Sequence, residues 1–147
     1  MKKTIEVVSE RNHIHRQRVE LDGFEDLFVD VPEAYGGEGS APDPHDYFDL
    51  SLGACKAITA MMYARRKKWP LEGVSVTVNR DDSQERHGTY RLDVAMAFHG
   101  IEEAKQRARL EEISHKCPIH RLMTTATVEV NTRLVDQSPA IASRADA

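Results

Sequence analysis

The sequence has little cysteine and no excess of basic charge. Only two of its 147 residues are cysteine, and 20 Lys and Arg residues face 24 Asp and Glu residues, which gives a formal net charge of -4. Such a balance offers no basic surface for nucleic acid or for an anionic membrane. We therefore expect neither of them as a partner.

Long apolar runs are also missing. The N-terminal stretch MKKTIEVVSER has two lysines but no apolar segment of signal-peptide length, so the expected location is the cytoplasm. No stretch has the ~20 uninterrupted apolar residues of a membrane span. The length predicts one domain over residues 1–136, followed by a small, polar and flexible tail over 137–147.

The chain is organised around a predicted long helix from Pro44 to Lys68. Asp43 supplies an N-cap before Pro44, and four cations close the other end before Trp69-Pro70. Apolar side chains run almost all the way round this helix, which predicts burial on every side. One chain of this length provides little cover for it, so we expect a two-fold dimer with the helix near the interface.

The flanking segments alternate mostly with the period of β-strands. We expect strands over 3–8, 13–21 and 26–31 with a turn at Asp22-Gly23, a strand pair over 74–79 and 89–98, and a closing strand over 126–135. The spacing from Ile101 to His115 predicts an amphipathic helix with Ala104, Ala108, Leu110 and Ile113 on its apolar face. The fold class is therefore α+β with mainly antiparallel sheet.

Cys55 and Cys117 are candidate functional residues, because cysteines of a reducing compartment are more often reactive than bridged. Cys117 precedes Pro118, so its sulfur is expected at a helix N-terminus, where the helix dipole stabilises a thiolate. Cys55 lies deep inside its helix and needs a cation from another segment. The candidates are the arginines of the N-terminal strands, Arg11, Arg16 and Arg18.

Other interpretations of the two cysteines stay open at this point. Neither belongs to a CxxC motif, which argues against a thioredoxin-type motif or a zinc ribbon. Cys55 is compatible with a small hydrophobe in a core, and Cys117 with a simple cap residue. A zinc site made from both sulfurs with His115 and His120 is conceivable, although the local spacing matches no usual ligand pattern.

Two segments resemble the signature regions of the OsmC/Ohr family of osmotically inducible and organic hydroperoxide resistance proteins. They are PHDYFDLSLGACKAITAMMYARRKKWPLEGVSVTV and HKCPIHRLMTTATVEVNTRL, and GGEGSAPDP resembles the usual lead-in. The likeness extends over about residues 30 to 135 and points to the OsmC-like branch. It implies an OsmC-like fold in which antiparallel sheets wrap long central helices in an intertwined homodimer.

The resemblance also implies a thiol-dependent peroxidase for organic hydroperoxides that serves in oxidative stress defence. Cys55 matches the peroxide-attacking cysteine of the family, and Cys117 matches its resolving partner. In such a cycle a sulfenic acid forms and condenses to a disulfide, which a lipoyl or thioredoxin-like dithiol resets. No metal, flavin or heme is needed.

The sequence departs from the family pattern beside the helix cysteine. A glutamate that orients an activating arginine usually stands ten residues before that cysteine, and His45 occupies the position here. Arg18 is our choice for the arginine, because it lies inside an apparent strand. We expect Arg18 and His45 to contact substrate, although His45 is equally compatible with a first-turn surface residue.

The alternative functions are a non-catalytic dimeric binding protein for a small apolar ligand and a zinc-dependent module.

Overall fold

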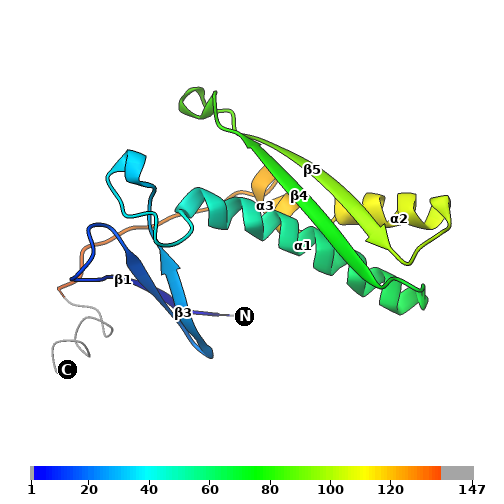
Figure 1. Ribbon diagram of the computed structural model, residues 1–147, viewed down its shortest axis with the longest axis horizontal. Helices are drawn as coiled ribbons and strands as arrows, with labels where there is room; N and C mark the ends of the chain where they lie inside the picture. The colour runs from blue at the N-terminus through cyan, green and yellow to red at the C-terminus, as the bar shows by residue number, and fades with distance from the viewer. Residues whose placement is uncertain (1, 137–147) are drawn as a thin grey trace. The chain divides into compact units, whose positions relative to one another are not determined.

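The computed structural model describes residues 2–136, so the tail predicted over 137–147 lies outside the described residues (Figure 1). The described chain divides into two compact units. The first contains the residues up to Tyr47 together with those from Val130 onward, and the second spans Phe48–Glu129. The single-domain organisation expected from the length stays a prediction.

The first unit contains a three-stranded antiparallel sheet. Its strands are β1 (Ile5–Ser9), β2 (Gln17–Leu21) and β3 (Phe24–Val29), in that order across the sheet. Gly23 has a φ of 83°, which confirms the turn predicted at Asp22-Gly23, since glycine adopts this conformation without steric cost. The second strand begins at Gln17 rather than His13, because residues 11–15 form turns and bends.

A loop that includes a 3-10 turn, η1 (Glu33–Tyr35), leads from the sheet to the long helix. A buried carboxylate anchors this loop: Asp30 accepts hydrogen bonds from the Val31 backbone N–H and from the backbone N–H and hydroxyl of Ser40. The Ser40 hydroxyl bond is the main cause that lowers the pKa of Asp30 to about 2. Gly37 is required here, because a Cβ atom would lie 2.1 Å from the Val31 carbonyl oxygen.

The long helix α1 (Pro44–Lys67) has the ends that its sequence predicts. Asp43 accepts a hydrogen bond from the Asp46 N–H at 2.8 Å, while Asp46 accepts one from the Asp43 N–H at 3.0 Å, which forms a reciprocal cap. At the other end Lys68 takes a left-handed conformation with a φ of 57°, and the Trp69 N–H donates to the Ala64 carbonyl at 2.9 Å. Both ends of α1 are therefore fixed locally.

The second unit covers one face of α1 with a hairpin and a second helix (Figure 1). The hairpin pairs β4 (Gly73–Asp81) with β5 (Arg91–His99) in antiparallel register, with the 3-10 turn η2 (Glu85–His87) between them. A Cβ atom on Gly53 would lie 3.1 Å from Val78, so α1 and β4 pack closely there. The second helix, α2 (Ala104–Ser114), completes a core of Ala60, Ala64, Ile101 and Leu110.

Burial of α1 on every side is not seen within one chain. Its buried residues recur every three or four positions, as expected for a single face: Asp49, Leu52, Gly53, Lys56, Ala60 and Ala64. Several large apolar side chains elsewhere on the helix are 46 to 63% exposed: Phe48, Leu50, Ile58, Met61 and Met62. We call these five residues the exposed apolar face of α1.

Two further predictions were wrong. Residues 126–135 form no strand, because no strand of the described chain pairs with them, and Val128 and Val130 are exposed. On α2, Leu110 and Ile113 are buried but Ala104 and Ala108 are exposed, so the buried residues lie in the C-terminal half of the helix. Among residues 2–136, we find no helix whose length and apolar character would suit it to crossing a membrane.

Candidate functional site

The fold brings together two cysteines that stand 62 positions apart in the sequence. Cys55 lies half-buried on α1, and Cys117 is fully buried between α2 and α3 (Pro118–Thr124). Both are free thiols, and the Cys55 side chain lies near enough to Cys117 to raise the pKa of its thiol. Contact between the two sulfurs is what formation of a disulfide requires.

Cys117 is held at the start of α3 as its neighbours in the sequence predict. It has an extended backbone and is the N-cap residue, and Pro118 fills the first helical position. Its Sγ accepts a hydrogen bond from the His120 backbone N–H at 3.3 Å. The predicted location of this sulfur at a helix N-terminus is therefore confirmed.

The acidity expected for Cys117 is not seen. Burial raises the pKa of the Cys117 thiol, and the nearby Cys55 side chain raises it further. The His120 N–H and the positive charge of Lys56 act in the opposite direction, but they do not offset the burial. The helix terminus at Cys117 is visible in the local sequence, whereas its full burial depends on residues distant in the chain.

Lys56 is a buried cation beside the cysteine pair. Its side chain is only 4% exposed, and its Nζ donates hydrogen bonds to the Ser114 carbonyl oxygen at 3.1 Å and to His120 Nδ1 at 3.0 Å. Acceptance at Nδ1 makes His120 the neutral tautomer with its proton on Nε2. Burial lowers the pKa of His120, and the charges of Lys56 and His115 add to this effect.

Sequence reasoning missed Lys56, although a signal was present. Lys56 is the only charged residue between Leu52 and Ala64, in a helix that otherwise carries small and apolar side chains there. A lysine in such a place is rarely buried unless it is paired. The sequence alone does not reveal its partners, because Ser114 and His120 lie 58 and 64 positions away.

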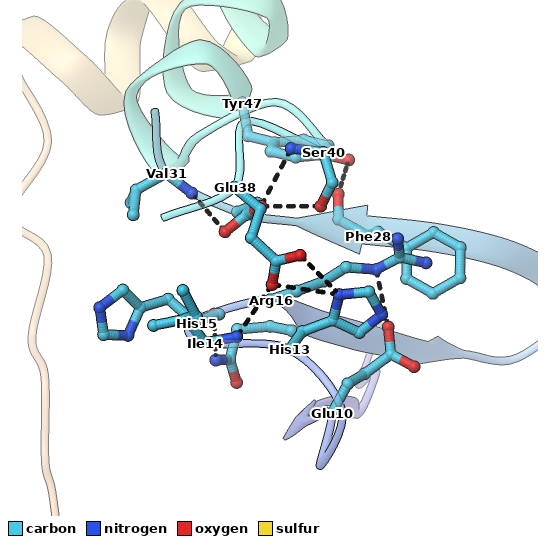
Figure 2. Close-up of polar contacts among 12 residues, drawn as sticks. Glu10, His13, Ile14, His15, Arg16, Phe28, Val31, Glu38, Ser40 and Tyr47 are labelled. Carbon is cyan, nitrogen blue, oxygen red and sulfur yellow. Dashed lines mark hydrogen bonds and ion pairs between the residues drawn. The ribbon is translucent and has the colours of Figure 1, made fainter. Parts of the chain in front are cut away.

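The remaining predicted site residues lie in the first unit. Arg18 lies on β2 and forms an ion pair with Glu20, and its buried Nε meets no acceptor among the described residues. Arg16 donates to Glu10 at 2.8 Å and stacks 3.9 Å from the centre of the Phe28 ring (Figure 2). His45 is half-buried in the first turn of α1. The roles expected for Arg18 and His45 stay predictions.

A metal centre finds no support in the described part of the chain. Within residues 2–136, no three His, Cys, Asp or Glu side chains gather closely enough to hold a metal ion. His120 directs its Nδ1 to Lys56, and His115 pairs instead with Glu111, at 2.6 Å.

Comparison with known proteins points to one family. A family model described as OsmC-like protein matches residues 37–133. No curated protein matches the chain. A protein from Psychrobacter arcticus, described as belonging to an osmotic stress and detoxification response, has a TM-score of 0.70 at 18% identity over 85% of this chain and 90% of its own.

Two other solved structures agree with this result. An organic hydroperoxide resistance protein from Legionella pneumophila, also described as a redox protein and a regulator of sulfide bond formation, is 25% identical, with a TM-score of 0.61 over 85% of this chain and 90% of its own. An OsmC-like protein from Mycoplasma pneumoniae is 19% identical, with a TM-score of 0.64 over 92% of this chain and 99% of its own. The described antiparallel sheets and helices of this chain match the OsmC-like fold.

Proposed function

The chain belongs to the OsmC-like protein family, and from this premise we propose that it reduces organic hydroperoxides with Cys55 and Cys117 as a two-cysteine pair. The observation that carries the proposal is the proximity of the two free thiols, one half-buried and one fully enclosed. A peroxide can reach the sulfur of the half-buried Cys55, and the sulfur of the enclosed Cys117 lies near it. The description of the Legionella pneumophila protein as an organic hydroperoxide resistance protein supports an organic hydroperoxide as the substrate class.

The reaction proceeds in two balanced steps. The Cys55 thiolate attacks the distal oxygen of ROOH, the O–O bond breaks, and ROH leaves while Cys55 becomes a sulfenic acid. The Cys117 sulfur then attacks the Cys55 sulfur, and the hydroxide that leaves takes the Cys117 proton to form water. An external dithiol, lipoyl or thioredoxin-like, returns the disulfide to two thiols by exchange.

We propose Arg18 and His45 as substrate-binding residues of this reaction. Arg18 supports the assignment because its buried Nε has an unused donor among the described residues. An arginine and a histidine are suited to bind the oxygens of a peroxide or to orient a thiolate. Arg18→Lys and His45→Ala should each slow the attack of Cys55 on peroxide and leave the later disulfide step unchanged.

The protein acts as an intertwined homodimer in this proposal. Members of the family are typically dimeric. The exposed apolar face of α1 presents side chains that water solvates poorly, and a second copy of the chain would cover them. The alternating residues 126–135, which pair with no strand of the described chain, are suited to join a sheet of that second copy.

Turnover in the presence of a dithiol tests the proposed activity. Wild-type protein should consume cumene hydroperoxide faster than hydrogen peroxide, because an alkyl group gains from apolar contacts that hydrogen peroxide lacks. Cys55→Ser should abolish turnover. Cys117→Ser should retain a single reaction with peroxide and stop at the sulfenic acid. Turnover by Cys55→Ser equal to that of wild type would reject the proposal.

One feature favours the alternative of a dimeric binding protein for a small apolar ligand. A hollow of about 420 Å³ lies at the C-terminal end of α1, and its lining includes Ile58, Met61, Met62, Trp69 and Leu71. Volumes of this order suit small ligands. Binding of a fluorescent fatty acid that survives in Cys55→Ser, together with no peroxide consumption by wild type, would favour this function over the peroxidase.

A further inference from the structure

We propose that Lys56 is a positioning residue of the cysteine pair, which keeps a positive charge beside Cys117 and thereby promotes the disulfide-forming step. The inference rests on the proposed peroxidase function and adds to it a residue that the resemblance to known proteins does not supply. Lys56 follows Cys55 directly on α1 and reaches the segment that holds Cys117.

The geometry fixes Lys56 to both sides of Cys117. Its Nζ is bonded to the carbonyl of Ser114, three residues before Cys117, and to the ring of His120, three residues after it. The backbone N–H of the same His120 donates to the Cys117 sulfur. One ammonium group therefore ties the end of α2 and the start of α3 to the helix that carries Cys55.

The positive charge of Lys56 counteracts the effect of burial on the pKa of Cys117. The Cys117 thiol is enclosed, and burial raises its pKa, although only the thiolate is a good nucleophile for the sulfenic acid. The titratable groups around it are Cys55 and Lys56 from α1, and His120 with its neighbour His115. His120 is neutral, so Lys56 is the group among these that carries the compensating charge.

The expected change in the rate of disulfide formation follows from the way in which the pKa of a thiol sets both its ionised fraction and its nucleophilicity. Loss of one neighbouring charge should raise the pKa of Cys117 by about one unit, which cuts its thiolate fraction about tenfold below that pKa. A more basic thiolate is intrinsically about threefold more reactive, so the net loss of rate at neutral pH is about threefold. Above both pKa values the variant should equal or exceed wild type. A purely structural defect would instead slow the step equally at every pH.

The test measures the lifetime of the Cys55 sulfenic acid after one equivalent of cumene hydroperoxide, by trapping with dimedone and mass spectrometry across a range of pH. Lys56→Met removes the charge, and Lys56→Gln removes it while keeping hydrogen-bond donors. Lys116→Met is the matched control, because it removes an exposed lysine directly before Cys117. Circular dichroism and thermal unfolding establish whether each variant is folded.

We expect both Lys56 variants to prolong the sulfenic acid about threefold at neutral pH, with the difference vanishing or reversing at high pH, and the Lys116 control to match wild type. An unchanged lifetime and pH profile in folded Lys56→Gln would overturn the proposal. Failure of both variants to fold would assign Lys56 to stability and overturn it as well.

A second measurement separates this inference from the peroxidase function. The ultraviolet absorbance of thiolate, compared between proteins with and without Cys117, reports the pKa of that thiol with no peroxide present. If wild type does not react with peroxide but Lys56→Gln still raises the pKa of Cys117, the proposed function fails and the electrostatic role of Lys56 stands. If wild type forms the disulfide and the pKa of Cys117 is the same in the variant, only the inference about Lys56 fails.

Discussion

Leu110→Ala should destabilise the protein strongly, because Leu110 ties α2 to the core beside α1. The Leu110 side chain is fully buried, and its core partners include Ala60, Ala64 and Ile101. Removal of three carbons costs about 2.4 kcal/mol in transfer free energy at ~0.8 kcal/mol for each methylene. The alanines of α1 are too short to fill the space, so a cavity adds to that cost.

We therefore expect a loss of about 3 to 4 kcal/mol in the free energy of unfolding, within the range of buried leucine truncations. For a protein of this size the loss corresponds to a fall of roughly 10 °C in Tm. Urea and thermal unfolding at one protein concentration measure it, because a dimer would make Tm depend on concentration.

Leu122→Ala is the matched control for this experiment. The change of side chain is the same, but Leu122 on α3 is 49% exposed, so we expect a loss of about 1 kcal/mol or less. Equal losses for the two variants would refute the assignment of Leu110 to the core. The position of α2 would then need another explanation, and so would the placement of Cys117 just after it.

The remaining predictions concern charge and assembly. Because the pKa of Asp30 is lowered from 3.8 to about 2, its ionised form stabilises the fold above pH 4, and that stability is lost as the pH falls from about 4 to about 2. Between pH 2 and pH 4, the free energy of unfolding of Asp30→Asn should accordingly change less with pH than that of wild type. The same pH dependence in both proteins would contradict the interaction with Ser40. Leu52→Asp should cost more than about 3 kcal/mol, because it places a charge on the buried face of α1, and an unchanged Tm would show that this face is not enclosed. Met62→Glu, on the exposed apolar face of α1, should leave the secondary structure intact and convert the proposed dimer to monomers, which light scattering measures. A wild-type protein that is itself monomeric would reject the dimer.

Local signals in the sequence were sufficient for the elements around the site. The ends of α1 follow from Asp43, Pro44 and the basic residues before Trp69, because capping and dipole effects act within one helical turn. The cap formed by Cys117 and Pro118 is equally local. The strand pair β4 and β5 follows from strict alternation of apolar residues.

Features that depend on distant residues could not be predicted in the same way. The alternation in residues 126–135 indicates a strand, but a strand also needs an edge to pair with, and no edge strand of the described chain pairs with this segment. The burial of Asp49 is explained by Arg80 and Tyr90, whose side chains donate hydrogen bonds to its carboxylate from the hairpin. Lys56 is a similar case, since its partners come from α2 and α3.

The direct test of the redox pair is a thiol count on fully reduced protein after one equivalent of cumene hydroperoxide per chain. The account predicts that two thiols disappear and that proteolytic mapping finds one disulfide joining the peptides of Cys55 and Cys117 within the same chain. Two thiols that remain free, or a disulfide that links two chains, would contradict it.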